Sequence, residues 1–268
     1  RQAEALFARA RVLLRARNLP DFSLTETVMI GEEQSFGAHA RAAGTRELIC
    51  KLVVDHPAQE GAGIFAREQW AGISGMAVGT SINLATHVIP LTGTFLFLIE
   101  KLAATATMTI GGTTCEIPVV PGEPLLVVTA SAQRASAPLA LSEPVEVDLV
   151  RLAWARSGDK GQLFNVAVIA RRPEWLPFLK AALTPEAVSE WYRHLGQNGQ
   201  QPAVRAHDVP GVHALNFVID GALPGGINAS TRLDPAAKGM AQMLLRFPVP
   251  FPAALTASLN CQTSNSGD

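Results

Sequence analysis

One short run in this sequence has the residue types best suited to chemistry. Residues 156–161 read Arg-Ser-Gly-Asp-Lys-Gly. Glycines allow positive φ and close approach of a ligand to the main chain. Successive N–H groups in such a turn form an anion-binding hollow, to which basic side chains add charge. We therefore expect a loop here that binds a phosphate or carboxylate through Arg156, Ser157, Gly158, Lys160 and Gly161. The alternative is a plain hairpin turn in which Asp159 caps local N–H groups.

A second glycine-rich loop, Asp-Gly-Ala-Leu-Pro-Gly-Gly, spans residues 220–226. Each loop follows a predicted strand, so the two loops meet at one end of a sheet if those strands are neighbours. Asp159 or Asp220 would then handle protons. The other residues expected around this polar cleft are Lys160, Gly225, Gly226, Arg232 and Asp234. The alternative is that the carboxylates are caps and partners of the basic groups.

Histidines and serines give weaker signals. His213 starts an apolar strand and is a candidate general base, although a lone histidine on a strand is also a common core residue. The histidines have no i, i+4 helical spacing and the cysteines have no CxxC spacing, so we predict no metal site. The sequence has no GxSxG motif, and Ser157 has no identifiable base.

Asn165 and Asn216 each lie in or beside an apolar strand. A buried amide without a partner would cost about 1–3 kcal/mol. We therefore predict that both side chains hydrogen-bond the backbone of the glycine loops and hold the turns in shape. The alternative is that both amides lie at solvated strand ends.

Composition narrows the function classes. The chain has 268 residues, of which 48% are hydrophobic, and a formal net charge of −1. Nothing in this balance favours nucleic acid or an anionic membrane surface, and no apolar run reaches the roughly 18 residues of a spanning helix. Three scattered cysteines, Cys50, Cys115 and Cys261, indicate a reducing, cytoplasmic setting.

Periodicity predicts an α+β protein with two domains. In the first half we expect helices over 2–17 and 58–70, strands over 24–30, 48–55 and 125–130, and a hairpin of 105–110 with 114–119. In the second half we expect strands over 149–154, 166–170, 203–209, 213–219 and 227–233, and helices over 174–183, 185–195 and 235–245. Thr184 and Asp234 are the predicted N-caps of the last two helices.

Several segments carry a family resemblance. In the second half they are 156–161 with Asn165 and 168–171, then 172–173, 183–184, 215–217, 220–226, 230–234 with Lys238, and 244–248. These segments resemble the C-terminal domain of the AtuA family of acyclic terpene utilisation proteins. The first half is more loosely similar to the end of that family's core domain, at 37–41, 46–47, 66–68 and 75–79.

The resemblance implies the remnant of an α/β core domain followed by a ferredoxin-like α+β domain. The implied bounds are 1–131 for the core part, 132–144 for a linker, 145–252 for the ferredoxin-like domain and 253–268 for a tail. It also implies a setting in the breakdown of acyclic terpenoids and related branched acids, carried as CoA thioesters. Two departures from the family pattern are the absence of a Gly-Gly-Arg-Pro segment in 80–90 and a glutamine, Gln162, where an acidic residue is frequent.

The leading hypothesis is an enzyme, or an enzyme subunit, that acts on a branched acyl-CoA or the free acid. Hydratase or lyase chemistry fits better than redox chemistry because no nicotinamide or flavin fingerprint is present. Coenzyme A would enter as part of the substrate. The rival is a non-catalytic assembly or ligand-binding subunit. The apolar stretch 91–99 further predicts a partner chain that carries the rest of the core, or a homo-oligomer.

Overall fold

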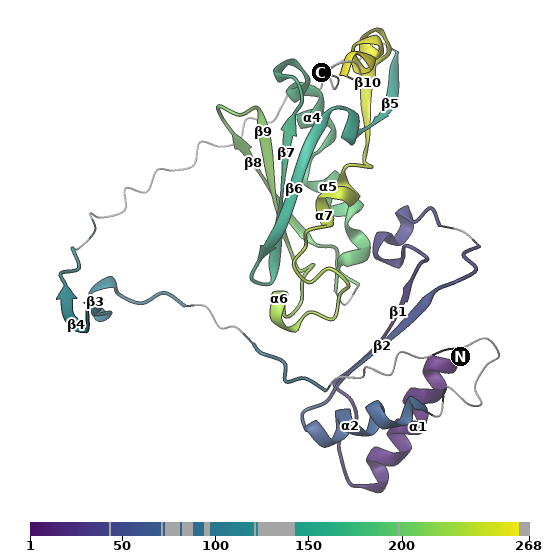
Figure 1. Cartoon of the computed structure of the whole chain (residues 1–268). Helices are drawn as coiled ribbons and strands as arrows, with labels where there is room; N and C mark the ends of the chain where they lie inside the picture. The colour runs from purple at the N-terminus through teal and green to yellow at the C-terminus, as the bar shows by residue number, and fades with distance from the viewer. Residues whose placement is uncertain are drawn as a thin grey trace.

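The computed structural model describes residues 1–42, 44–70, 72, 81, 88–93, 97–120, 122, 143–197 and 199–262. Figure 1 shows a helical unit with a long hairpin at the N-terminal end, an arm that carries a small hairpin, and a sheet covered by helices. In the described part of the chain no helix is long and apolar enough to cross a membrane. The α+β class predicted from the sequence is confirmed.

The N-terminal unit is built on two amphipathic helices and one antiparallel hairpin. Helix α1 (Gln2–Ala16) packs on α2 (Gln59–Glu68), and the rings of Phe7 and Phe65 stack at 5.3 Å between centroids. Strands β1 (Leu24–Ile30) and β2 (Ile49–Asp55) pair antiparallel along their whole length. These elements lie where the apolar periodicity predicts them. The 3-10 helix η1 (Gln34–His39) lies in the connection between the two strands.

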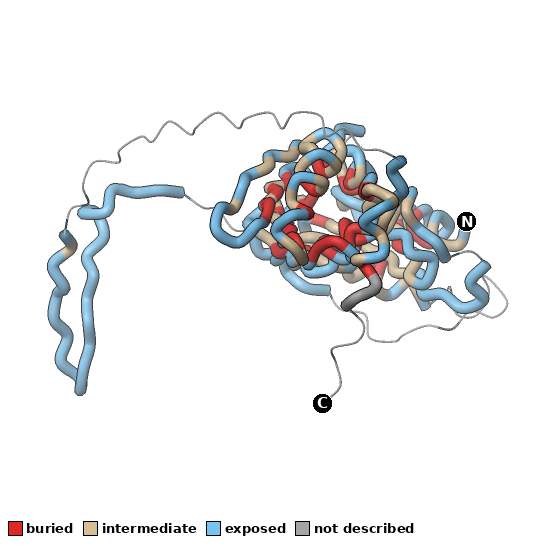
Figure 2. Tube along the Cα trace, turned by 90° about the horizontal axis from the view of Figure 1, so that it is seen from above, coloured by how far each residue is buried: buried red, intermediate tan, exposed pale blue. Residues whose placement is uncertain are grey.

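The arm holds a second, smaller hairpin. A short 3-10 turn, η2 (Lys101–Ala103), precedes strands β3 (Ala106–Ile110) and β4 (Thr113–Ile117). The turn between them is Gly111-Gly112, both with positive φ, as two-residue hairpin turns require. Every residue of both strands is exposed, and Figure 2 shows this arm apart from the rest of the chain. The predicted strand 125–130 and most of the predicted linker lie outside the described residues.

The second half is organised around a four-stranded antiparallel sheet. Its strand order is β6-β7-β9-β8. The strands are β6 (Ala153–Lys160), β7 (Leu163–Ala170), β8 (Ala203–Val209) and β9 (Ala214–Asp220). From β7 onward the succession of elements is the β-α-β-β-α-β order of ferredoxin-like units. The last strand, β10 (Pro248–Pro252), pairs with β5 (Pro144–Asp148) instead of joining the main sheet.

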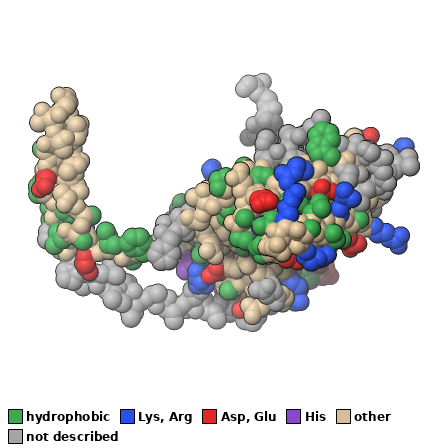
Figure 3. Space-filling view, turned by 90° about the horizontal axis from the view of Figure 1, so that it is seen from below, with side chains coloured by type: hydrophobic (Ala, Val, Ile, Leu, Met, Phe, Trp, Pro, Cys, Tyr) green, Lys and Arg blue, Asp and Glu red, His purple; other side chains and the backbone are tan. Residues whose placement is uncertain are grey.

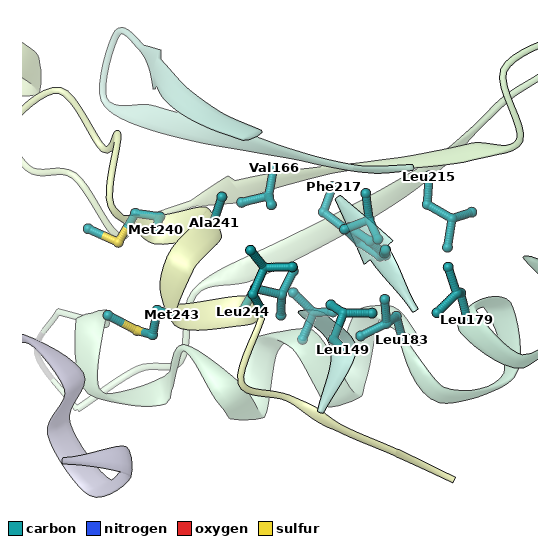
Figure 4. Packing of buried hydrophobic residues seen from close by; sticks show 14 of the residues in the cluster. Leu149, Val166, Leu179, Leu183, Leu215, Phe217, Met240, Ala241, Met243 and Leu244 are labelled. Atoms are coloured by element: carbon teal, nitrogen blue, oxygen red, sulfur yellow. The ribbon is translucent and has the colours of Figure 1, made fainter. Parts of the chain in front are cut away.

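Short helices cover one face of this sheet. They are η4 (Pro173–Trp175), α4 (Leu176–Ala182), α5 (Pro185–Trp191), η5 (Arg193–Leu195) and α7 (Met240–Leu244). Figure 4 shows Leu179 and Leu244 beneath Val166 and Phe217 of the sheet, all in one core cluster. Thr184 caps α5 as predicted, since its hydroxyl accepts from the Ala187 N–H at 3.2 Å.

Four local predictions in this half are wrong. Residues 149–151 form a 3-10 turn, η3 (Leu149–Arg151), and 157–160 belong to strand β6 rather than to a loop. Residues 226–229 form a helical turn, α6 (Gly226–Ala229), where a strand was expected, because Gly225 and Gly226 have positive φ. Helix α7 starts at Met240 rather than at 235, since Ala237 also has positive φ, and its N-cap is Gly239 rather than the predicted Asp234. After β10, residues 253–262 form the 3-10 segment η6 (Ala253–Gln262).

Candidate functional site

The two glycine-rich segments meet at one end of the sheet, as predicted. Strand β7 pairs with β9, and Phe164 lies opposite Ile219. Gly161 makes the turn between β6 and β7 with a φ of +68°. A Cβ on Gly226 would lie only 2.8 Å from the Gly161 carbonyl oxygen, so the two turns touch through their backbones. The glycines here therefore allow close packing of the turns.

Three of the predicted polar site residues form hydrogen bonds with backbone groups instead of lining a cleft. Asp220 Oδ1 accepts from the Gly221 N–H at 2.8 Å. Asp234 accepts from the N–H groups of Lys238 and Gly239, at 3.0 and 2.6 Å. Ser157 is buried, donates to the Lys238 carbonyl oxygen and accepts from the Ala241 N–H at 2.8 Å. For these residues the capping alternative describes the structure.

Arg232 lies away from the 157–161 strand. Its guanidinium donates to the Leu195 carbonyl oxygen at 2.6 Å, and its buried Nε has no partner among the described residues. Burial lowers the pKa of this guanidinium, and the nearby Glu26 carboxylate raises it. Next to it, Thr231 bonds Glu26 through its hydroxyl and accepts from Lys51 Nζ through its carbonyl. Arg232 therefore belongs to the junction with the N-terminal unit.

The face of the sheet opposite the helices gathers the other predicted binding residues. Side chains alternate along the strands: Phe164, Val166 and Val168 point to the core, while the residues between them lie on the open face. The strand registers arrange the open face in rows. The rows are Lys160–Leu163, then Gly158–Asn165–Val218–Arg205, then Arg156–Ala167–Asn216–His207, and Trp154–Ile169–Ala214–Val209. In the described chain no helix covers this face.

Three cations cluster at edge strand β6, two from the strand itself and one, Lys238, from the segment before α7. A Cβ on Gly158 would lie 2.8 Å from Lys238 Nζ and 3.9 Å from Lys160 Nζ, so both ammonium groups lie within 4 Å of one point above the strand. Arg156 lies two residues along the same face, and it lines a shallow hollow of about 360 Å³ together with Lys238. None of the three forms a salt bridge with a described residue. We call Arg156, Lys160 and Lys238 the cation cluster.

Beside the cluster, Asn165 and Asn216 bond each other. Asn165 Nδ2 donates to Asn216 Oδ1 at 2.9 Å across β7 and β9. The prediction that both amides bond loop backbone is therefore wrong, because the two residues lie diagonally opposite on neighbouring strands, within reach of one another. Both side chains are half-buried in the middle of the open face.

The three predicted catalytic groups lie in different places. Asp159 lies on the core side of β6, half-buried, and its backbone N–H donates to Ala236. Asp220 is the only carboxylate on the open-face positions of the four strands and lies beside Ala203 at one sheet end. His213 is exposed at the turn before β9, with positive φ, at the other end of that seven-residue strand. About 20 Å of strand therefore separates His213 from Asp220.

The open face also carries an apolar row next to the cations. Trp154 is 52% exposed and Ile169 is 39% exposed, and the two lie opposite each other in the register. The Arg171 guanidinium lies over the Trp154 ring, 4.7 Å from the centroid. One surface thus combines positive charge without salt bridges to described residues, two amides and partly exposed apolar side chains.

Residues 147–250 match the family model of the AtuA ferredoxin-like domain. This segment is similar to the AtuA ferredoxin-like domain, the name used for it below. The match covers the second half and confirms the resemblance there. No curated protein and no solved structure matches the chain. The core-domain resemblance of residues 1–131 stays a prediction.

Lys238 is the site residue that sequence reasoning missed. The site hypothesis assumed a loop at 157–161, whereas the cluster is built from strand β6 and the segment that crosses its edge before α7. The Asp234 cap and the Ser157 hydroxyl bond that segment and place Lys238 above Gly158. The available signal was the lysine just after the Ser-Thr-Arg-Leu-Asp run of the AtuA ferredoxin-like domain.

Proposed function

We propose that the AtuA ferredoxin-like domain binds an anionic, branched acyl ligand on its open sheet face. The ligand would be an acyl-CoA or the free acid, and the chain would be the ligand-binding subunit of an enzyme for acyclic terpenoid or branched acyl-CoA breakdown. The observation that carries this proposal is the cation cluster above Gly158. Three scattered cysteines support a cytoplasmic location for this role.

The charge of the cluster supports an anion as the ligand. Two ammonium groups held near one point repel each other, and a phosphate or carboxylate would relieve that repulsion. Such a charge-assisted contact is about twice as strong as a neutral hydrogen bond. Gly158 has no side chain, which leaves room for Lys238 Nζ above the strand, next to Lys160.

The neighbouring rows support an acyl group. Trp154 and Ile169 offer apolar surface one row from Arg156. An acyl chain laid there would bury apolar area worth about 25 cal/mol per Å². An anion at the cluster and an apolar chain along this row together match a carboxylic acid or its CoA thioester. A purely polar anion would contact the cation cluster but not the apolar row.

Acid–base catalysis is the second candidate, and it would rest on Asp220. This carboxylate is the only one on the open-face positions and lies in line with Lys160, with their Cα atoms about 10 Å apart. Its Oδ1 already accepts from Gly221. The geometry favours a ligand-binding role, because the three catalytic candidates Asp159, Asp220 and His213 lie apart from one another, whereas the cation cluster, the amides and the apolar row share one face.

Tryptophan fluorescence tests the binding proposal. Isovaleryl-CoA, coenzyme A and geranic acid are titrated into the chain at low and high salt. We expect saturable binding of the acyl-CoA, weaker binding of coenzyme A, and affinities that fall with salt. The change in emission should vanish in Trp154→Phe, while calorimetry still detects binding. Absence of binding for all three ligands would overturn the proposal. Turnover that Asp220→Asn abolishes would favour the catalytic candidate.

A further inference from the structure

The arm hairpin has two chemically different faces. The β3–β4 register puts Met108 opposite Cys115 and Ala106 opposite Ile117, and Ile110 lies on the same side. The other side carries three threonines and one carboxylate: Thr107, Thr109, Thr114 and Glu116. Such a pattern is typical of a sheet with one buried face.

The apolar face of this hairpin is nevertheless uncovered. Ile110 is 67% exposed, and the preceding segment exposes Phe97, Leu98 and Ile99. Figure 3 shows hydrophobic side chains along the arm, which stands clear of the body. An isolated two-stranded hairpin is marginally stable in water. The hairpin therefore needs a surface on which to dock.

The N-terminal unit has a groove that fits a strand. It measures about 2010 Å³, and every residue of β2 from Ile49 to Asp55 lines it, whereas β1 contributes only Ile30. Side chains of both faces of β2 reach the groove because it runs along the free edge of that strand. In the described chain β1 pairs with the other edge, and no strand pairs with this one.

Part of the groove floor is apolar, although Gln2 of α1 and Gln59 of α2 also line it. Leu6 of α1 and Ala62, Phe65 and Ala66 of α2 line it beneath the edge of β2. A strand added to β2 would continue the sheet and lay its apolar face on these helices. Its backbone would satisfy the unpaired N–H and C=O groups of the edge.

We propose that the β3–β4 hairpin of one copy docks into this groove of a second copy, with β4 alongside β2. Charge favours β4. Glu116 is the only charged residue of the hairpin strands, and Lys51, whose Nζ donates to the neutral Thr231 carbonyl oxygen and forms no salt bridge with a described residue, lies on the face of β2 that points away from the groove floor. Reciprocal exchange of hairpins closes a two-fold dimer and leaves neither groove empty.

A second copy fits better than the chain's own hairpin. The segment 88–91 of the same chain lines the groove and then leads away from it. Figures 1 and 2 both place the hairpin far from its own N-terminal unit. This inference is independent of the cation cluster, which lies on the ferredoxin-like domain.

Two natural thiols test the docking. Cys50 in β2 and Cys115 in β4 are both free and exposed. Each lies on the side of its strand that would face the helices. In a Cys261→Ser background, a short bis-maleimide should join Cys50 of one chain to Cys115 of another. Burial raises the pKa of the Cys50 thiol, so the coupling is run at mildly alkaline pH.

Mixing isotopically labelled and unlabelled chains before the coupling distinguishes exchange from folding back. We expect cross-linked peptides that pair one labelled with one unlabelled chain. The matched control moves the thiol to the other face of the hairpin, with Cys115→Ser and Thr114→Cys, and should lose most of the cross-link. A cross-link confined to single chains would overturn the second-copy proposal, and so would the absence of any cross-link.

Light scattering gives an independent readout. Met108→Asp puts a charge on the apolar hairpin face and should halve the mass from dimer to monomer, whereas Thr109→Asp on the polar face should leave it unchanged. Neither residue belongs to the folded cores, so circular dichroism should stay the same for both. A wild-type monomer, or equal behaviour of the two variants, would contradict the proposal.

Discussion

The imidazole of His39 stacks on the indole of Trp191, with 3.6 Å between ring centroids and 18° between planes. His39 Nε2 also lies 3.0 Å from the Trp191 carbonyl oxygen. His194, three residues further on, bonds the Ser35 carbonyl oxygen through its own Nε2. These contacts join η1 of the N-terminal unit to the end of α5. The two halves of the chain are therefore interlocked through aromatic rings and main-chain carbonyls.

Gly37 is the position where this junction tolerates no side chain. A Cβ there would lie 2.4 Å from His194 Cγ, and the φ of Gly37 is +56°. Gly37→Ala should lower the free energy of unfolding by about 1–3 kcal/mol, the usual cost of overpacking. Urea unfolding measures it. Gly44→Ala is the control, because Gly44 has a similar φ of +68° and nothing within 4 Å. Equal losses in both variants would show that backbone strain, and not the clash, is responsible.

The junction should weaken in acid. Burial lowers the pKa of His194, and the charges of His39 and Arg232 lower it further. Because the folded pKa lies below the ordinary 6.5, the unfolded chain binds the proton more readily as the pH falls through this value. The contribution of neutral His194 to the free energy of unfolding is therefore complete above pH 6.5 and is lost progressively as the pH falls below this value. Urea midpoints at neutral and mildly acidic pH measure the slope. His194→Gln keeps a donor for Ser35 and should flatten that slope; an unchanged slope would assign the titration to another group.

Ser157 should act as a structural residue. Its hydroxyl bonds both Lys238 and Ala241, and it is 5% exposed. Ser157→Ala leaves the Ala241 N–H without a partner and should cost about 1–3 kcal/mol of stability. Ligand affinity should fall as well, because the segment that carries Lys238 loosens. Ser23→Ala, which removes an exposed hydroxyl bonded to Asp55, serves as the control and should cost less. A Ser157→Ala protein of unchanged stability would refute the structural role.

The amide pair on the open face should be energetically coupled. Asn165→Ala and Asn216→Ala each leave the other amide without its partner, so the double variant should be more stable than the sum of the single losses implies. We expect a coupling of about 0.5–1.5 kcal/mol, the net worth of one hydrogen bond. Urea unfolding of the four proteins in the cycle measures it. Strict additivity would mean that water replaces the bond at no cost.

The sequence predicted correctly those elements whose structure depends mainly on a few neighbouring residues. Alternation from Leu24 onward, the Gly111-Gly112 turn and the Thr184 cap all depend on a few neighbouring residues, and the structure has them as predicted. The prediction for segment 157–161 was wrong. Its glycines suggested a loop, whereas residues 157–160 pair with β7 as a strand and Asp159 also bonds the Ala236 carbonyl oxygen. Tertiary pairing overrode the local signal there.

The candidate site was predictable only in part. Arg156, Lys160, Asn165 and Asn216 do lie on one surface, because alternate residues of neighbouring strands share a face. Lys238 joins them through a crossing over the edge of β6, which no local pattern encodes. Arg232 does not lie with the other predicted site residues. It is buried at the junction between the two halves, where it donates to the Leu195 carbonyl oxygen and lies near Glu26. His213 also lies apart from the other site residues, because it belongs to a turn and not to a strand.

The affinity of Lys238→Ala for isovaleryl-CoA shows whether the cation cluster binds the anionic ligand. Lys180→Ala is the matched control, because it removes the same charge from a lysine that already pairs with Asp208. Calorimetry on the wild-type chain and both variants gives the three dissociation constants. If the cation cluster binds the anion, Lys238→Ala should weaken binding about tenfold or more, the worth of one bond to a charged group, and Lys180→Ala should leave it near the wild-type value. Equal affinities for all three proteins would contradict the account.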